Sequence, residues 1–268
     1  MISDALTREL ELWAAQDRRA TLWLRDDDAC RDSAALARLL ALATTHAVPV
    51  AIAAIPAALE STLAPALERC DEAIVVQHGF AHRNHAPEGE RSAELYDGRN
   101  DADACINELR RGRGRLAATF GDRFVPILVP PWNRAGDKLL PHFRDAGFTG
   151  LSRFGPRASR EAAPGLRQVN THVDPIAWRR DRRFIGEDAA LSRLVDHLRA
   201  RRQGDCDADE PTGVLTHHLA FDAPAWEFLD ALLAATTSHP ACAWLDVRQA
   251  FAPEGARDHL RPISMNRV

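Results

Sequence analysis

Short apolar runs with the composition of β-strands alternate with amphipathic helical runs along most of the chain. Strands are expected at residues 21–25, 49–55, 73–77, 124–129, 148–152, 168–173, 213–216 and 243–247. Helices are expected between them, at residues 33–45, 59–70, 101–120, 137–146, 189–201 and 225–235. Repeated strand–helix units predict an α/β fold in which helices cover a parallel sheet. At 268 residues, 46% of them hydrophobic, the chain has the size of one α/β barrel domain.

Charge and composition exclude several classes of function. The net charge is -4 and the pI about 6.3, and nothing indicates the basic face that a nucleic-acid site would need, so no nucleic-acid partner is expected. The first twenty residues contain no apolar run typical of a signal peptide, and the longest apolar stretch, near residues 47–59, contains two prolines. No membrane partner is therefore expected. The five cysteines are widely spaced without a C-x-x-C pair, which favours reduced thiols and a cytoplasmic protein. The oligomeric state stays open.

Polar residues follow several of the expected strands at the point where each strand ends. Asp26, Asp27 and Asp28 follow the first strand. In parallel α/β folds the carboxyl ends of the strands carry the active site. Three adjacent carboxylates repel one another unless a cation lies nearby, so a metal ion is one interpretation. The alternative is helix N-capping, since a helix is expected from residue 33.

Three histidines follow the third strand within eight residues, at His78, His82 and His85. Histidines four residues apart can face one ion in a helical or tightly turned segment, and Gly79 permits an unusual backbone there. Together with a carboxylate they form a common ligand set for a catalytic metal with open positions for water. Such histidines are otherwise surface or core residues.

Two further strand ends carry candidate site residues. After the fourth strand, residues 130–133 read Pro-Pro-Trp-Asn, which indicates a stiff loop whose tryptophan lines a substrate groove or fills the core. His217 and His218 end the seventh strand, where a histidine beside a metal could protonate a leaving group. The acidic run at residues 204–212 is expected to be a solvated loop, and the tail from residue 252 irregular. Neither G-x-S-x-G nor a complete dinucleotide-binding glycine motif is present.

Together these motifs resemble the polysaccharide deacetylases, the family 4 carbohydrate esterases. The resemblance implies a distorted parallel (β/α) barrel of seven or eight strands, with residues 1–268 as one catalytic domain and a core at about 20–250. Residues 24–29, Leu-Arg-Asp-Asp-Asp-Ala, are similar to the family's first motif, with Asp27 as catalytic base and Asp28 as metal ligand. A shift by one aspartate stays open. His78 and His82 match its His-x-x-x-His metal pair.

The remaining motifs are similar in order and spacing. Pro131 and Trp132 resemble the third motif and, with Asn133 and Asp174, are expected at the substrate. Asp174 and Trp178 loosely match the fourth motif, and Leu215 with His217 matches the last, which implies His217 as general acid. One departure is Val129, where the family has an arginine that braces the catalytic aspartate; Arg25 and Arg134 are candidate replacements. Another is Ala29, in place of a glycine.

The resemblance implies a metal-dependent hydrolase that removes an acyl group, N-acetyl first among the candidates, from a carbohydrate or related amide. The expected substrate is a small molecule or an oligosaccharide. Zn²⁺ is the expected metal, with Co²⁺, Ni²⁺ or Mn²⁺ as alternatives. Two other functions stay open. One is an amidase or esterase acting on a non-sugar substrate, and the other is a binding protein on a degenerate barrel.

Overall fold

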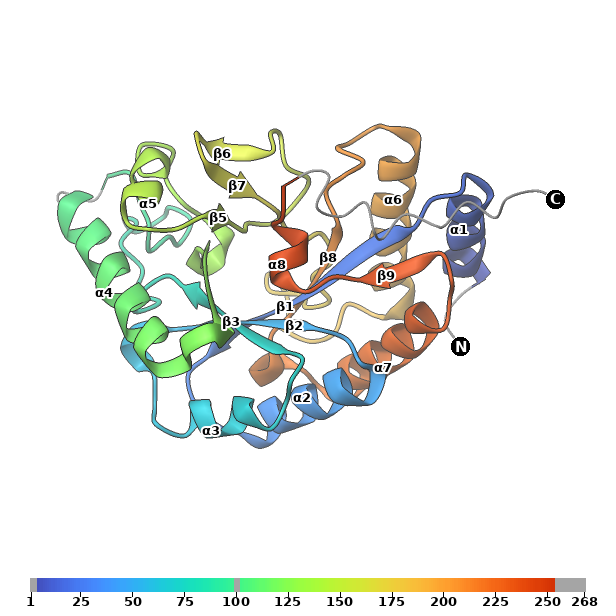
Figure 1. The fold of residues 1–268 in the computed structure, drawn as a ribbon, viewed down its shortest axis with the longest axis horizontal. Coiled ribbons are helices and arrows are strands. Elements are labelled where there is room, and N and C mark those ends of the chain that lie inside the picture. The colour runs from blue at the N-terminus through green and yellow to red at the C-terminus, as the bar shows by residue number, and fades with distance from the viewer. Residues whose placement is uncertain (1–3, 99–101, 254–268) are drawn as a thin grey trace.

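The computed structural model describes residues 4–98 and 102–253 as an α/β fold (Figure 1). Its strands are β1 (Ala20–Ala29), β2 (Val50–Ala54), β3 (Ala73–His78), β4 (Phe124–Val129), β5 (Gly150–Leu151), β6 (Glu161–Ala163), β7 (Leu166–Gln168), β8 (Thr212–Thr216) and β9 (Cys242–Trp244). Its α-helices are α1 (Asp4–Ala15), α2 (Ala34–His46), α3 (Leu63–Glu68), α4 (Ala102–Phe120), α5 (Leu140–Asp145), α6 (Glu187–Gln203), α7 (Ala223–Thr237) and α8 (Val247–Ala250).

Eight of the described strands form a sheet in the order β6-β7-β5-β4-β3-β2-β1-β8, and β9 pairs with the beginning of β1 beside this path. Every pairing is parallel except that of β6 with β7. The segment that follows β7 closes the sheet on itself. Thr171 bridges to Phe154 beyond β5, and Val173 bridges to Val214 of β8. Seven segments of the described chain thus form a ring: the strands β1, β2, β3, β4, β5 and β8, and β7 together with the residues that follow it up to Val173. The ring confirms the predicted distorted (β/α) barrel.

Helices cover the outside of the ring because their apolar residues recur every three or four positions. In α2 the buried residues are Leu36, Leu39, Leu40 and Ala43. Ser33 caps this helix by accepting a hydrogen bond from the Leu36 N–H, so the aspartate run of β1 is not its cap. Figure 1 shows α4 and α5 on one flank of the barrel and α1 with α6 on the other.

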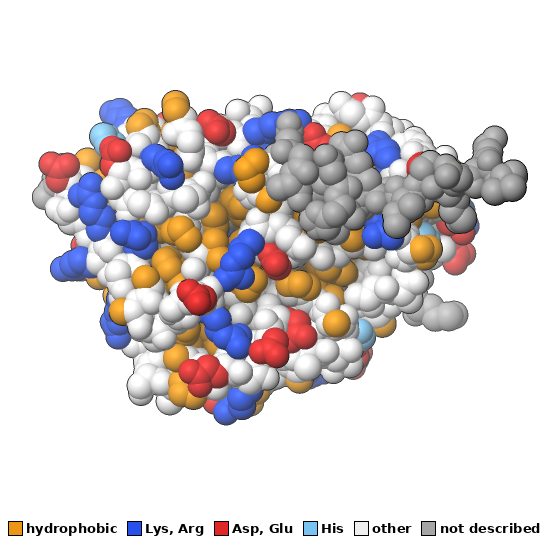
Figure 2. All heavy atoms as spheres, in the orientation of Figure 1, with side chains coloured by type: hydrophobic (Ala, Val, Ile, Leu, Met, Phe, Trp, Pro, Cys, Tyr) orange, Lys and Arg blue, Asp and Glu red, His pale blue; other side chains and the backbone are white. Residues whose placement is uncertain are grey.

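Apolar side chains also fill the barrel interior. Trp23, Val76, Val129 and Leu245 belong to this cluster, and Phe251 packs edge-on against Trp23 with ring centroids 6.0 Å apart. Phe251 lies beside Gly150, the first residue of β5, so side chains close the barrel at the amino end of the strands. Figure 2 shows this face with acidic and basic side chains interspersed. The opposite, carboxyl end of the strands is left for a site.

Several predicted boundaries were wrong. The helix expected at 59–70 begins only at Leu63, because Glu60 donates its N–H to the Cys30 carbonyl and holds a turn against the end of β1. The last strand ends at Trp244 rather than 247, because Asp246 and Gln249 form a capping box that starts α8. Helix α1 and the β6–β7 hairpin were not predicted. Most of the tail expected to be irregular lies outside the described residues.

No helix in the described ranges is long and apolar enough to cross a membrane. All five cysteines are free.

Candidate metal and catalytic site

The three consecutive aspartates at the end of β1 have three different sets of partners. Asp28 has a φ of +74°, and the pairing of β1 with β2 shifts register between Asp26 and Ala29. Left-handed backbone is uncommon outside glycine, and aspartate tolerates it better than most residues. This irregularity brings Asp27 and Asp28 to the same cavity, although neighbours on a regular strand point to opposite faces.

Asp27 is held by Arg25, two residues earlier on the same face of β1. Arg25 Nε lies 2.9 Å from Asp27 Oδ1, and Nη2 donates to Oδ2 at 3.0 Å. The guanidinium is fully buried and also donates to Ser152 Oγ at 2.7 Å and to Asn133 Oδ1 at 2.6 Å. Arg134, the other candidate, donates instead to the Ser92 carbonyl. Arg25 therefore holds Asp27 in place, so no arginine is needed at position 129 for this purpose.

Asp26 belongs to the wall of the barrel, not to the cavity. Its Oδ1 accepts hydrogen bonds from Thr216 Oγ1 and from the His218 N–H, and its Oδ2 lies 2.6 Å from His218 Nδ1. Both side chains are buried. Burial by itself lowers the pKa of His218, but the Asp26 carboxylate outweighs it and the pKa is raised. Because His218 is bound in this way, His217 is the histidine of the pair that faces the cavity.

His78 and His82 approach Asp28 from the loop that follows β3. Asp28 Oδ1 lies 3.2 Å from His78 Nε2 and 3.3 Å from His82 Nε2. Three ligand atoms at 2.0–2.1 Å from one tetrahedral ion are about 3.3–3.4 Å apart, so the triad fits a zinc-sized cation. Asp28 Oδ1 is buried without a hydrogen-bond partner, as a ligand oxygen reserved for a cation would be.

The proton of His78 is directed away from this triad. Its Nδ1 lies 3.0 Å from the Val129 carbonyl, which can only accept, so Nδ1 carries the hydrogen and the Nε2 lone pair faces Asp28. Burial lowers the pKa of His78, but Asp27 and Asp28 raise it above its usual value. Burial raises the pKa of Asp28, but the interaction with His78 and then the charges of His217 and His82 lower it below its usual range.

A buried glutamate that the sequence did not single out holds the loop between the two histidines. Glu94 is 1% exposed and accepts hydrogen bonds from the N–H groups of Phe80 and Ala81. Gly79 has a φ of +51°, and a Cβ there would lie 1.9 Å from Glu94 Oε2. Only glycine fits this position, which confirms its predicted conformational role. The loop geometry therefore fixes the two histidine side chains relative to β3.

On the far side of Asp27 lies His217, whose Nε2 is 4.0 Å from Asp27 Oδ2. The Trp178 ring packs edge-on against His217 at 4.6 Å, and its Nε1 donates to Asp174 Oδ2 at 2.7 Å. Burial raises the pKa of Asp174, while His217 and two hydrogen bonds act in the opposite direction. Asp174 is thus tied to Trp178, which in turn orients the imidazole of His217.

The Pro-Pro-Trp-Asn loop contributes two of its residues to the cavity. Trp132 packs on His82 with centroids 4.3 Å apart, and Asn133 accepts the hydrogen bond from Arg25. Both have positive φ, near +55°. Pro131 was expected at the substrate, but it is buried against Gly79 and is not among the cavity-lining residues. It supports the histidine loop because its ring fills the space that glycine leaves.

The cavity that these residues share has a volume of about 1260 Å³. Asp27, Asp28, His78, His82 and His217 all line it. Six arginines also line it, and they come from three parts of the chain that the sequence analysis did not bring together: Arg91, Arg134, and the group of Arg179, Arg180, Arg182 and Arg193. Phe154 and Trp178 add exposed aromatic surface to the same walls.

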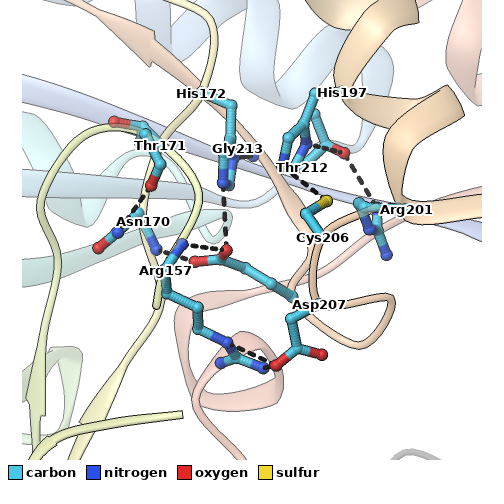
Figure 3. Close-up of polar contacts among 12 residues, drawn as sticks. Arg157, Asn170, Thr171, His172, His197, Arg201, Cys206, Asp207, Thr212 and Gly213 are labelled. Atoms are coloured by element: carbon cyan, nitrogen blue, oxygen red, sulfur yellow. Dashed lines mark hydrogen bonds and ion pairs between the residues drawn. The ribbon is translucent and has the colours of Figure 1, made fainter. Parts of the chain in front are cut away.

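A second group of possible metal ligands lies beside the cavity wall, where Figure 3 shows its surroundings. His172, His197 and Glu210 have ligand atoms within 4.8 Å of one another. However, His172 Nδ1 accepts the Gly213 N–H at 2.9 Å, so the neutral ring carries its proton on Nε2. His172 Nε2 lies 3.4 Å from Glu210 Oε2, and because this nitrogen carries a proton it has no lone pair with which to bind a metal.

This second group is therefore a polar network that anchors the loop preceding β8. Glu210 accepts the backbone N–H groups of Arg157 and Asn170, and Arg157 pairs with Asp207 at 2.8 Å (Figure 3). Burial raises the pKa of Glu210 to about 7. The prediction that residues 204–212 form a solvated loop was wrong for Glu210, which is 1% exposed. The sequence pattern did not indicate that Glu210 is buried, because this residue lies outside the strands.

The barrel described above is a fold that this chain shares with several solved structures. One is a candidate polysaccharide deacetylase from Mycobacterium smegmatis, with TM-score 0.61 and 14% identity, covering 87% of this chain and 82% of that one. Another is the peptidoglycan N-acetylglucosamine deacetylase Bc1960 bound to 4-naphthalen-1-yl-N-oxidanyl-benzamide, with TM-score 0.56, 14% identity, and coverage of 89% and 95%.

A third neighbour is a variant of BA3943, described as a family 4 carbohydrate esterase pseudoenzyme with restored enzymatic activity. It has TM-score 0.58 and 16% identity over 87% of this chain and 68% of that one. No protein-family model matches the chain, and no curated protein sequence matches it. The chain therefore has the fold of the family 4 polysaccharide deacetylases at low sequence identity. Because a pseudoenzyme shares this fold, the fold alone does not decide activity.

Proposed function

We propose that this protein is a metal-dependent hydrolase that removes an acyl group, N-acetyl first among the candidates, from a sugar or related amide. The observation that carries the proposal is the separation of roles along β1. Asp28 joins His78 and His82 in a cation-sized triad, while Asp27 is oriented beside it by Arg25. Zinc is the proposed ion, because a carboxylate and two imidazoles suit it and leave positions open.

A divalent ion at the triad would supply Lewis acidity to a water and to the carbonyl under attack. The chain's own residues would do the rest. Asp27, fixed by two contacts with Arg25, would accept the proton of the attacking water. His217 lies 4.0 Å from Asp27 and faces the cavity, so it would protonate the departing amine. Asp174 and Trp178 would hold that imidazole in position.

Aromatic side chains make a sugar the favoured acyl carrier. Trp132, Phe154 and Trp178 line the cavity, and Phe154 and Trp178 are 44% and 41% exposed. Exposed aromatic faces of this kind favour an amphipathic ring as ligand. A non-sugar amide or ester remains the second candidate substrate, because the triad chemistry does not depend on the carrier.

The test is elemental analysis of bound metal, on wild-type protein and on His78→Ala/His82→Ala, both purified without chelators, followed by an acetate-release screen. One equivalent of metal that is lost in the double variant, together with acetate release from an N-acetyl sugar, supports the proposal. Metal without hydrolysis of any amide or ester would favour a binding protein on the same barrel. Wild-type protein that takes up no metal after reconstitution would overturn the proposal.

A further inference from the structure

The mouth of the cavity carries far more positive charge than the rest of the molecule. Six arginines line it, against three aspartates, in a chain whose net charge is -4. Asp27 is already paired with Arg25, and Asp28 is assigned to the triad, so two of the three carboxylates are engaged. Among the described residues, none of the six arginines forms an ion pair with a carboxylate: Arg91, Arg134, Arg179, Arg180, Arg182 and Arg193. Their charge is available to a ligand.

The arginines come from two walls that converge. Arg91 and Arg134 lie on the wall formed by the β3 and β4 loops, and the others belong to the segment between β7 and α6 or to α6 itself. The pKa of Arg134 is lowered, first by burial and then by the charges of Arg91 and Arg179. Since Arg179 belongs to the other wall, like charges from both sides face one another across the mouth. An anion between them would relieve this repulsion.

One loop, between Ala177 and Arg183, contributes three of the six arginines, Arg179, Arg180 and Arg182. Its base is closed by the Ile176–Phe184 bridge and by the hydrogen bond from the Ala177 N–H to the Arg183 carbonyl. The one acidic residue between them, Asp181, accepts the Arg183 N–H. At the entrance of the loop, Trp178 is fixed by its hydrogen bond to Asp174. The guanidinium groups of this loop are therefore presented beside an aromatic face that is itself held against His217.

We propose that the substrate of this site is an anionic acylated sugar, one that carries a phosphate or carboxylate group bound by the arginine mouth while its acyl group reaches the triad. The inference rests on the proposed function for the acyl chemistry, but the anion site itself depends only on the arginines. Guanidinium groups bind phosphate and carboxylate through paired N–H donors, which gives both charge and geometric recognition. The three aromatic side chains would contact the sugar ring between these two ends.

The test compares hydrolysis of three N-acetyl sugars that differ in charge: N-acetylglucosamine, its 6-phosphate, and N-acetylmuramic acid, which bears a carboxylate. Wild-type protein is expected to prefer at least one anionic sugar over the neutral one by about tenfold or more in kcat/KM. Arg179→Gln/Arg182→Gln is expected to lose most of that preference through KM, with bound metal unchanged. Arg8→Gln, an exposed arginine of α1 remote from the cavity, is the matched control.

A second measurement does not require turnover. Binding of inorganic phosphate is measured by calorimetry on wild-type protein and on the same two variants. Binding that weakens in Arg179→Gln/Arg182→Gln but not in Arg8→Gln supports the anion site even if no sugar is hydrolysed, a result that would count against the proposed function only. Equal kcat/KM for neutral and anionic sugars, with phosphate binding that ignores the loop variant, would overturn the inference while leaving the hydrolase proposal intact.

Discussion

Arg25 and Asp27 lie two residues apart on the same face of β1 and contact each other through both carboxylate oxygens, at 2.9 and 3.0 Å. The pair is nearly inaccessible to solvent, with side chains 0% and 2% exposed. Because Arg25 and Asp27 belong to the same strand, the distance between them does not depend on the conformation of the neighbouring loops. Arg25 therefore holds Asp27 from within β1, the role that the family resemblance assigned to an arginine at the position of Val129.

Replacing Arg25 should separate orientation of the base from binding of the metal. In Arg25→Gln the buried Asp27 carboxylate loses its counter-ion, and breaking such a pair costs about 3–5 kcal/mol of folding stability. We expect metal content near wild type, because the triad is untouched, and a turnover number reduced about 100-fold or more. Urea unfolding and acetate release measure the two effects. Full activity with an unchanged midpoint would refute the bracing role.

Asp26 and Asp27 form a matched pair for a second prediction. Asp27→Asn should keep the metal but lose turnover, because an amide cannot take the proton, and it should also lower stability because Arg25 loses its buried counter-ion. Asp26→Asn should likewise destabilise the protein, by weakening the buried contact with His218, but the surviving folded protein should remain active. Metal analysis, thermal unfolding and kcat on both variants distinguish the roles. Loss of turnover in Asp26→Asn alone would show that the family motif is shifted by one residue.

Gly79 and Gly114 give a further matched pair. Gly79→Ala forces a Cβ into Glu94 and a left-handed backbone, so we expect the His78–His82 loop to shift and metal affinity to fall about tenfold or more. Gly114→Ala in α4 meets nothing within 4 Å, and should stabilise the helix by about 0.5–1 kcal/mol. Competition with a chelator and thermal unfolding provide the measurements. Wild-type metal affinity in Gly79→Ala would contradict the tight fit.

The pKa of Glu210 predicts a pH dependence of stability. Its pKa rises from 4.5 to about 7 on folding because the carboxyl group is buried. The neutral form is favoured in the folded state, so this contribution is fully present below pH 4.5 and is lost as the pH rises through about 7. The loss is at most roughly 3 kcal/mol. Accordingly, the free energy of unfolding of wild type minus that of Glu210→Gln should fall across this window. A flat difference would contradict the shift.

The alternation of apolar strands and amphipathic helices predicted the helix-covered parallel sheet, and the family resemblance supplied the barrel and the choice of Asp28, His78 and His82, which the structure brings together. The sequence was not sufficient to assign Asp26 or to choose between His217 and His218. That decision depends on the register of β1 with β8, which aligns Asp26 with Thr216. Glu94 and the arginine mouth escaped prediction for a related reason. Their contacts form only where loops from distant parts of the chain come together, and a pattern within one segment does not show this.

The bridge between Ile176 and Phe184 has a consequence for how such proteins diverge. The ring is closed by the bridge between Val173 and Val214. The arginine-rich loop follows it, between Ala177 and Arg183, and its two ends are joined to each other by their own backbone contacts. As long as Trp178 keeps its contacts with Asp174 and His217, the rest of this loop can be lengthened or shortened without reopening the ring or displacing the triad. On the proposed recognition of an anionic substrate, altering this one short loop would change the preferred substrate while the barrel stays the same.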